Sequence, residues 1–346
     1  MPEYGTIKDI KDPIEKTRTV EKLLKLRRQL DDEIPKKTAT ETLILATWNI
    51  REFNNNRSDE SLRYIAEIIS RFDLIAIQEV SSDMGGLKRL VAFLGKNWDY
   101  IVTDSTEGDA GGMERMAFVF DKSKVFFRNI AGELVLPYNK LIESGEKKLQ
   151  FARTPFSVAF GANWFEFMLT TVHILWGSGK KVDPQRLKEI TAIAQWLKER
   201  ARVEKENYIL LGDFNIFKTN DATIKALEEG SFYIPQAIRN HPSDLGKTRH
   251  YDQIAFKLTR DQNMPVFNED YQRAGAFDFS KSVYTPDDVD LYRGYFEKKN
   301  VDGRTKAQIK EYYLTYYRTF QMSDHLPLWI ELKIDFSNES LKKHIS

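Results

Sequence analysis

An aspartate and an asparagine stand two positions apart directly after an apolar run of the sequence. Residues 208–211 (Tyr-Ile-Leu-Leu) predict a buried strand, and Gly212 ends it just before Asp213 and Asn215. Because residues i and i+2 of an extended segment face the same side, this carboxylate and this amide lie together. They can hold a hydrated divalent cation, a water molecule and a phosphate oxygen. A plain turn uses the same residue types, so the choice between a turn and a functional site depends on the residues at the other strand ends.

Similar chemistry recurs wherever other apolar strands begin or end. The polar residues at these positions are Asn49, Glu79, Glu114, Arg153, His173, Asp213, Asn215, Asp252, Asp324 and His325. If the strand ends converge, one site contains several carboxylates, two imidazoles, two amides and an arginine. Each residue alone has an ordinary explanation, such as a solvated strand end or a surface arginine. Their shared position at strand ends favours a common site.

The ligand types favour a hard cation. Oxygen ligands with few histidines suit Mg²⁺ or Mn²⁺ better than zinc, and Mg²⁺ usually takes only one or two protein carboxylates. Glu79 is the best candidate ligand, supported by Asn49 and Asp324. The sequence therefore predicts a magnesium or manganese site.

Two histidines are each expected to pair with a carboxylate, Asp252 with His325 and Glu114 with His173. A neighbouring carboxylate raises the basicity of a histidine, which then exchanges protons near neutral pH. Together with a metal ion that withdraws charge from phosphate oxygens, these pairs suit phosphoester hydrolysis. Buried His–Asp pairs are also often purely structural, and that alternative stays open.

Basic side chains near the strand ends are the candidates for phosphate contacts. The planar fork of Arg153 can clamp a phosphate, and Lys180 and Lys181 form a candidate patch for a phosphate backbone. The chain has no cysteine, and no serine lies in a nucleophile-elbow pattern. Direct attack by water is therefore the simplest mechanism.

The composition indicates a folded globular protein. Its 346 residues are 41% hydrophobic and 30% charged, and the net charge of +1 does not by itself announce a nucleic-acid partner. The absence of cysteine excludes disulfides and cysteine-bound zinc. No apolar run approaches the roughly 18 residues that span a bilayer. The charged N-terminus lacks the apolar core of a secretory signal, so we expect a cytoplasmic monomer unless a signal was removed.

Apolar periodicity places strands and helices along the chain. Strands are expected at residues 43–48, 73–80, 116–120, 156–160, 164–172 and 208–211. Helical stripes are expected at residues 19–30, 59–70, 86–95 and 183–197. Many strands interleaved with a few helices favour a sheet-based sandwich covered by helices.

The chain is expected to form one catalytic domain over residues 41–334. Residues 1–40 are a charged helical extension, which we expect to pack on the outside of the domain rather than to bind a partner. Residues 335–346 look like a frayed tail. The glycine-rich segment 108–112 and the charged segment 139–150 are predicted to be loops.

A long segment, 257–321, precedes the last motif and is rich in aromatic and basic residues. It contains Tyr284, Tyr292, Tyr295, Tyr312, Tyr313, Tyr316 and Tyr317 among Lys298, Lys299, Arg304, Lys306 and Lys310. Aromatic rings interleaved with cations can stack single-stranded nucleotides. Packing of these tyrosines onto the domain is the simpler interpretation, and we prefer it.

Six separated motifs, in order, resemble the endonuclease/exonuclease/phosphatase superfamily and, within it, deoxyribonuclease I. They are Thr-Trp-Asn49-Ile-Arg-x-Phe, Ile-Gln-Glu79-Val, Thr-Val-His173, Gly-Asp213-Phe-Asn215, Tyr-Asp252-Gln-Ile and Ser-Asp324-His325-x-Pro. The resemblance covers most of the chain, from about Leu43 to Leu332. It implies an α+β fold, a four-layer α/β/β/α sandwich of two mainly antiparallel sheets.

The resemblance also implies roles for the motif residues. These are Glu79, Asn49 and Asp324 at the metal, Asp213 and Asn215 at the phosphate and the water, and the pairs His173 with Glu114 and His325 with Asp252. Arg153 matches the family's phosphate-contacting arginine. The family's base and acid are debated, and we predict that His325 activates the water and His173 protonates the leaving oxygen.

Two positions depart from deoxyribonuclease I. That enzyme uses an arginine and a tyrosine in the duplex minor groove, where this chain has Ser81 and Gly112. Duplex nicking in that manner is therefore not expected.

The sequence thus predicts a magnesium- or manganese-dependent phosphodiesterase, with DNA or RNA as the preferred substrate. A phosphatase or phospholipase of the same superfamily, acting on phosphoinositide or sphingomyelin-type substrates, is the alternative. A binding protein that has lost catalysis is less favoured, because every catalytic side chain is present.

Overall fold

The computed structural model describes residues 2–106, 112–259, 273–300 and 304–345, without the side chains of residues 297–300. Most of the glycine-rich loop 108–112 and part of the segment 257–321 lie outside the described residues, as do the side chains of Lys298 and Lys299. Within the described ranges, no helix is both long and apolar enough to cross a membrane.

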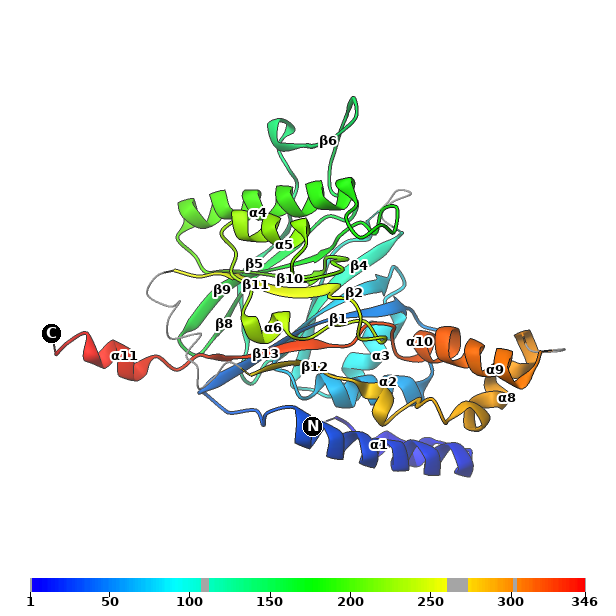
Figure 1. The fold of residues 1–346 in the computed structure, drawn as a ribbon. Helices are drawn as coiled ribbons and strands as arrows, with labels where there is room; N and C mark the ends of the chain where they lie inside the picture. Colours follow the sequence, from blue (N-terminus) through cyan, green and yellow to red (C-terminus); the bar gives the residue numbers. More distant parts are fainter. Residues whose placement is uncertain (1, 107–111, 260–272, 301–303, 346) are drawn as a thin grey trace.

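Two β-sheets form the centre of the molecule (Figure 1). The first sheet has, in order, β12 (Ala274–Ala276), β13 (Leu328–Lys333), β1 (Thr42–Phe53), β2 (Leu74–Ser81), β4 (Glu114–Asp121) and β3 (Trp98–Val102). The second has β11 (Asp252–Lys257), β10 (Tyr208–Asp213), β9 (Phe165–His173), β8 (Phe156–Ala162) and β5 (Phe126–Glu133). In each sheet one pair of neighbours is parallel, β1 with β2 and β9 with β10, and the other pairs are antiparallel.

Helices cover the outer faces of both sheets. The helices α1 (Pro13–Glu33), α2 (Asp59–Ile69) and α3 (Gly85–Leu94) lie below the first sheet in Figure 1, and α4 (Pro184–Glu204) and α5 (Ala222–Glu229) lie above the second. The start of α4 follows from its sequence, because the Asp183 carboxylate accepts the backbone N–H groups of Gln185 and Arg186 at 2.9 and 3.1 Å. The predicted four-layer sandwich is confirmed.

Strand β1 shows how the sequence builds two cores at once. Leu43 and Leu45 point into the core between the two sheets, and Ile44, Ala46 and Trp48 point into the core under α1–α3. A strand buried on both faces shows a continuous apolar run instead of alternation. The run from Leu43 to Trp48 has this form, and it places the strand at the centre of its sheet.

The strand directions bring seven chain segments to one edge of the sandwich. The parallel pairs β1–β2 and β9–β10 end at this edge, whereas β4, β11 and β13 run antiparallel to their neighbours and begin there. The register pairs Asp213 with both His173 and Asp252 across β9, β10 and β11. Polar residues at the ends of some strands and at the starts of others therefore meet.

A glycine allows two of these strands to lie close together. Gly212 has φ +131°, and a Cβ built on it would lie 2.1 Å from the carbonyl oxygen of Val172. Only glycine tolerates this backbone conformation and this contact. The residue before Asp213 thus lets β10 approach β9, which carries His173.

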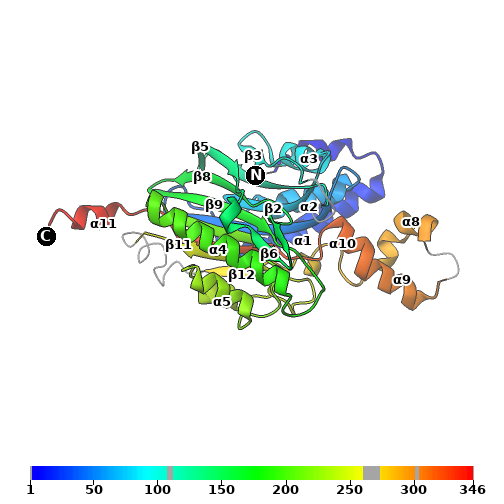
Figure 2. The ribbon, with the colours of Figure 1, turned by 90° about the horizontal axis from the view of Figure 1, so that it is seen from above.

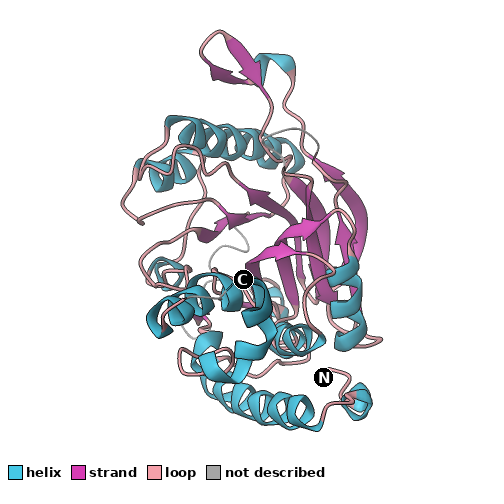
Figure 3. Cartoon of the chain, turned by 90° about the vertical axis from the view of Figure 1, so that its right-hand side faces the viewer, coloured by secondary structure: helices cyan, strands magenta, loops and turns pink. Residues whose placement is uncertain are grey.

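Two segments differ from the sequence expectations. Residues 139–150, predicted as a loop, contain a hairpin of β6 (Ile142–Ser144) and β7 (Lys147–Leu149) after the 3-10 turn η2 (Tyr138–Lys140). This hairpin stands away from the body beyond α4 (Figure 3). The tail carries the short helix α11 (Ser337–Lys342), which extends away from the body (Figure 2). Apart from Ile142, which is buried, the residues of these short elements are exposed or partly exposed and bury too little apolar surface to leave a periodic pattern.

The other elements lie within the ranges that the structure describes. They are η1 (Gly5–Asp9), α6 (Gln236–Arg239), η4 (Phe279–Lys281), α8 (Val289–Asn300), α9 (Lys306–Tyr312), the π-helical η5 (Tyr313–Tyr317) and α10 (Arg318–Gln321). Helices α8–α10 lie at the end of the sandwich opposite α11 (Figure 2).

Part of the tyrosine-rich segment packs onto the domain, as the preferred interpretation predicts. Tyr284, Tyr292 and Tyr313 are buried. The buried carboxylate of Glu60 on α2 accepts hydrogen bonds from the Tyr292 hydroxyl at 2.8 Å and from Arg18 on α1. One buried carboxylate thus ties α1, α2 and α8 together.

Candidate active site

Two histidines at the common edge are each paired with a carboxylate from the opposite sheet. His173, which ends β9, has Nδ1 3.0 Å from Glu114 Oε2 at the start of β4. His325, which precedes β13, has Nδ1 2.8 Å from Asp252 Oδ2 at the start of β11. Each carboxylate holds the Nδ1 side of its ring, so Nε2 of each histidine is available for other chemistry.

The two Nε2 atoms approach the same carboxylate. Asp213 Oδ2 lies 3.6 Å from His173 Nε2 and 3.8 Å from His325 Nε2. Glu114, His173, Asp213, His325 and Asp252 therefore form a chain in which carboxylates and imidazoles alternate. All of these side chains except that of Glu114 are buried.

The pairing determines the charge of two of these groups. Burial alone would raise the pKa of Glu114, but its pairing with His173, together with Arg153, outweighs burial and holds this pKa at about 2. Burial alone would lower the pKa of His325, but the charges of Asp252 and Asp213 outweigh it and raise this pKa well above its usual range. Glu114 is therefore ionised at neutral pH, and His325 holds its proton strongly.

Asn49 and Glu79 lie beside this chain at the ends of β1 and β2. Asn49 Nδ2 donates to Glu79 Oε1 at 2.8 Å and to Asp213 Oδ2 at 3.0 Å. The other Glu79 oxygen accepts the backbone N–H of Glu52 at 2.8 Å, and Glu79 itself has φ +60°. Such left-handed backbone at a non-glycine residue is costly and collects at functional sites.

The donor set fits a divalent cation. Asn49 Oδ1 is buried and has no hydrogen-bond partner among the described residues, which leaves an amide oxygen available beside the Glu79 carboxylate. Asp213, Asp252 and His325 also offer ligand atoms that lie within 4.8 Å of one another. Both groups belong to the same edge, and carboxylate and amide oxygens suit Mg²⁺ or Mn²⁺.

Two predicted site residues lie at the margin. The Asp324 side chain is exposed, and among the described residues its hydrogen bonding is limited to the backbone carbonyl, which accepts the N–H of Leu245 at 2.8 Å. The Lys180 side chain is also exposed, while its backbone carbonyl accepts a hydrogen bond from Arg186. The contacts of the described residues bring neither side chain into the alternating chain.

Arg153 and Asn215 are brought to the edge, where some of their polar groups are engaged by neighbouring residues. Arg153 Nε donates to Glu114 Oε2 at 2.7 Å, so its fork faces a carboxylate. Asn215 Nδ2 donates to the Ile174 carbonyl at 2.8 Å, and its backbone N–H binds Asp213 Oδ1 at 2.8 Å. Asn215 thus orients Asp213 directly and fixes the chain that follows His173.

A serine that sequence reasoning missed joins the two halves of the site. Ser323 Oγ donates to the Asn49 carbonyl at 2.6 Å and accepts the backbone N–H groups of His325 and Arg51 at 2.9 and 3.4 Å. It therefore positions the metal-binding candidate Asn49 relative to His325. Its place immediately before the Asp-His pair was visible, but its bonds to Asn49 and Arg51 join residues 274 and 272 positions apart.

A buried glutamate on α4 was missed as well. Glu189 accepts the backbone N–H of Ala152, next to Arg153, and that of Leu175, two residues beyond His173, at 2.9 and 3.2 Å. Glu189 therefore fixes the backbone next to Arg153 and the backbone that follows His173. The available signal was a charged residue at a core position of an amphipathic helix, one place before Ile190.

An aromatic wall adjoins His325. The Tyr251 ring lies 5.3 Å from the His325 ring, and Trp176 and Phe217 continue the wall at 5.5 and 5.8 Å from Tyr251. The Arg249 guanidinium lies 4.1 Å from the centre of the Phe217 ring. Aromatic rings therefore lie along the side of the alternating chain that His325 forms.

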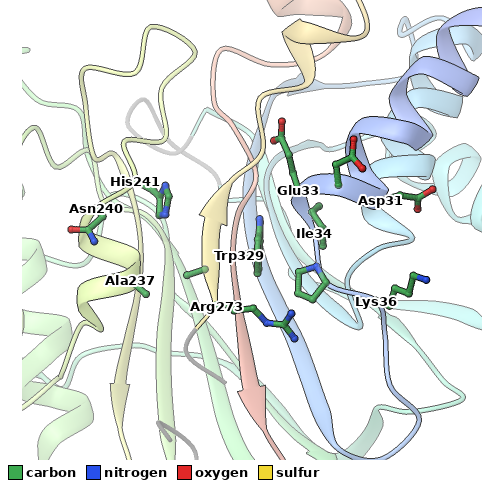
Figure 4. A pocket seen from close by; sticks show the side chains of 12 residues that line it. Asp31, Glu33, Ile34, Lys36, Ala237, Asn240, His241, Arg273 and Trp329 are labelled. Atoms are coloured by element: carbon green, nitrogen blue, oxygen red, sulfur yellow. The ribbon is translucent and has the colours of Figure 1, made fainter. Parts of the chain in front are cut away.

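A large open cavity lies elsewhere (Figure 4). It has a volume of about 570 Å³ and lies between the C-terminal end of α1, α6, β12 and β13. Its lining includes Asp31, Asp32, Glu33, His241, Arg273 and Trp329, and no residue of the alternating chain. The chemistry at the strand ends is therefore separate from this cavity.

Comparisons with solved structures show the same fold. An endonuclease/exonuclease/phosphatase family protein from Bacteroides thetaiotaomicron is 16% identical, with 86% of this chain and 97% of that chain covered and a TM-score of 0.54. A mannosyl-6-phosphatase, Bt3783, from the same organism is 16% identical, with coverage of 84% and 99% and a TM-score of 0.53. D. rerio TDP2, solved with a single strand DNA product, is 13% identical, with coverage of 84% and 98% and a TM-score of 0.53.

Sequence comparison identifies the family. A comparison with curated proteins finds no match. The profile of the Endonuclease/Exonuclease/phosphatase family matches residues 46–254, which is more than half of the chain and includes Asn49, Glu79 and Asp213. This match confirms the predicted family and the prediction of a phosphoesterase enzyme. The chain belongs to the Endonuclease/Exonuclease/phosphatase family.

Proposed function

We propose that this protein is a divalent-metal-dependent phosphodiesterase that cleaves nucleic acid by direct attack of water. The observation that carries the proposal is the alternating chain in which Asp213 lies between two imidazoles, each backed by its own carboxylate. It provides one proton-transfer group on either side of a central carboxylate. Hydrolysis of a phosphodiester needs both, because water loses a proton and the leaving oxygen gains one.

In this mechanism the two histidines have different tasks. His325 accepts the proton of the attacking water at Nε2, and Asp252 stabilises the resulting imidazolium through Nδ1. Asp213 orients the water from its position between the two Nε2 atoms. His173, held by Glu114, donates a proton to the leaving oxygen. The close approach of Nε2 of both rings to Asp213 supports this division.

Glu79 and Asn49 are proposed as the cation ligands, with Asp324 nearby. A bound Mg²⁺ or Mn²⁺ withdraws charge from the phosphate oxygens and stabilises the negative charge that develops during attack. Asn49 Nδ2 binds both Glu79 and Asp213, so the amide holds the cation ligand and the central carboxylate in one arrangement. Arg153, Asn215 and Lys180 are the proposed phosphate contacts.

A flexible nucleic acid is a better substrate for this edge than an intact duplex. Positions 81 and 112 carry serine and glycine instead of the groove-reading arginine and tyrosine of deoxyribonuclease I. Gly112 has φ +66°, and a Cβ on it would lie 3.0 Å from Glu114 Oε1, so a large side chain there would strain the backbone and crowd Glu114. TDP2, a protein of the same fold, was solved with single-stranded DNA.

A substrate panel tests the proposal. Purified protein is incubated with single-stranded DNA, duplex DNA, RNA, mannose 6-phosphate and sphingomyelin or phosphoinositide vesicles, each with Mg²⁺, with Mn²⁺ or with EDTA. We expect cleavage of single-stranded nucleic acid with either cation, no cleavage in EDTA, and recovery when the cation is restored. Glu79→Gln should raise the cation concentration needed for half-maximal rate, whereas the exposed Glu166→Gln should not.

Three outcomes oppose parts of the proposal. Release of phosphate from mannose 6-phosphate or from lipid, without nucleic-acid cleavage, would replace the substrate class. Cleavage that persists in EDTA would exclude the metal role of Glu79 and Asn49. No hydrolysis of any substrate with either cation would favour a binding protein.

A further inference from the structure

A row of three aromatic rings lies along α9, η5 and α10. The Tyr312 and Tyr316 rings lie 5.3 Å apart at 30°, and the Tyr316 and Phe320 rings lie 6.4 Å apart at 9°. Tyr316 is 46% exposed, and its two neighbours are partly exposed. These three rings are here called the aromatic ridge, and they contrast with the buried rings of the same segment.

An arginine accompanies each ring of the aromatic ridge. The guanidinium carbons of Arg304, Arg51 and Arg57 lie 5.2, 5.6 and 5.6 Å from the centres of Tyr312, Tyr316 and Phe320, respectively. Arg304 is exposed and Arg51 is partly exposed, so both charges can reach a ligand. Flat rings alternating with cations match a ligand that is aromatic and anionic at regular intervals.

The aromatic ridge is joined to the candidate active site. Arg51 lies two residues beyond Asn49 on β1, and its Nη1 donates to Thr319 Oγ1, on α10, at 2.8 Å. Ser323 follows α10 and binds the Asn49 carbonyl and the His325 N–H. Helix α10, at the end of the aromatic ridge, is therefore fixed to the metal-binding candidate Asn49 and to His325.

The helix that carries the aromatic ridge has an unusual form. Residues Tyr313–Tyr317 are π-helical between two α-helical segments. Single π-helical turns inside α-helices are rare and occur frequently at functional sites. Buried Arg57 supports the end of this helix, because it donates to the carbonyls of Phe320 and Met322.

We propose that the aromatic ridge binds the unpaired bases of a single-stranded nucleic acid whose scissile phosphate lies at the candidate active site. The proposal rests on the proposed nuclease function and adds to it a binding surface in the long segment before the last motif. Tyr316, the most exposed ring of the ridge, stacks a base, and Arg51 and Arg304 contact the adjacent phosphates. The successive rings of the ridge lie 5.3 and 6.4 Å apart, so they can engage successive nucleotides of an extended strand.

Binding without cleavage tests this proposal independently of catalysis. The Kd of a fluorescein-labelled oligothymidylate is measured by anisotropy in EDTA for the wild type, Tyr316→Ala, Tyr316→Phe and Tyr312→Ala/Tyr316→Ala. We expect Tyr316→Ala to raise Kd about 5- to 100-fold, the double variant to raise it further, and Tyr316→Phe to stay near the wild type because the ring remains. Tyr295→Ala is the matched control, since Tyr295 is 54% exposed in the same segment and belongs to no part of the ridge.

The outcomes separate this proposal from the nuclease proposal. A wild-type Kd for the folded Tyr316→Ala protein, or an equal rise of Kd in Tyr295→Ala, would contradict the proposed binding role of the ridge. Equal weakening of duplex and single-stranded DNA would overturn it too, because paired bases cannot stack on Tyr316. Binding that depends on the ridge, without phosphodiester cleavage in Mg²⁺, would support the proposed binding surface and contradict the nuclease proposal.

Discussion

Replacement of Asp213 by alanine is expected to lower kcat for the proposed nucleic-acid cleavage by about 10²–10⁴-fold, the usual contribution of general acid–base catalysis, because Asp213 lies beside both proposed proton-transfer groups. Asp213 Oδ2 is the only carboxylate oxygen that the structure places near both Nε2 atoms within the described residues. In the proposed mechanism, its loss removes the group that orients the attacking water between the two histidines. Initial rates at saturating substrate and cation measure the effect.

An isosteric variant separates this role from folding. Asp213→Asn keeps an oxygen for the backbone N–H of Asn215, and it should lose rate to a similar extent. The melting temperature should change by no more than about 2 °C, which corresponds to roughly 1 kcal/mol in a protein of this size. Asp99→Ala, at an exposed carboxylate on β3, is the control and should keep the parental rate. A parental rate in either Asp213 variant would contradict the central role of this residue.

Replacement of His325 is expected to cost about 10²–10⁴-fold in kcat, with an accompanying change in the pH profile. His325→Ala would leave the Asp252 carboxylate buried without its partner, which itself destabilises the fold. His325→Gln is therefore the better variant, because it retains a hydrogen-bond donor. His344→Ala, in the exposed tail, should be neutral.

The pH dependence follows from the raised pKa of His325. As proton acceptor, His325 must be neutral, so the rate should rise with pH until the pH exceeds that raised pKa. The negative charge of Asp252 contributes to the elevation, so Asp252→Asn should lower the pKa of His325. The acid limb of the kcat profile should then move to lower pH while the maximal rate falls. An acid limb that stays in place would show that His325 is not the base.

The central strands could be predicted because they are buried on both faces. Residues 43–48 and 208–211 are continuous apolar runs, and β1 and β10 contain them. Strand β5 could not be predicted in this way, because every one of its residues is at least partly exposed. Its strand conformation depends on pairing with β8, a contact between distant parts of the chain.

The candidate site was predictable as residue types but not as contacts. Motif order indicated His173, Asp213 and His325, and the parallel and antiparallel strand directions explain why their strand ends meet. The sequence contains no signal that Arg153 would face Glu114 rather than open solvent. It also does not reveal that Ser323 bonds to the Asn49 carbonyl, because that contact depends on the register of β13 against β1.

The tyrosines of segment 257–321 also show that the sequence predicts residue types but not their contacts. Tyr313 and Tyr316 are three positions apart, yet the first is buried and the second is about half exposed. A π-helical turn changes which side chains share a face, so α-helical periodicity does not describe this stretch. Packing and ligand stacking were therefore alternatives for the whole segment in the sequence, and the structure shows which individual rings are buried and which are exposed.

Anomalous diffraction from crystals soaked with Mn²⁺ and phosphate tests most directly whether the strand ends form one metal-dependent phosphoester site. We predict a manganese peak at the Glu79 carboxylate and Asn49 Oδ1, with phosphate within hydrogen-bond distance of His173 or His325 Nε2. A peak among Asp213, Asp252 and His325 would keep the site and reassign the ligands. Manganese bound only outside this edge, for example beside Asp31 and Glu33 in the cavity of Figure 4, would contradict the site.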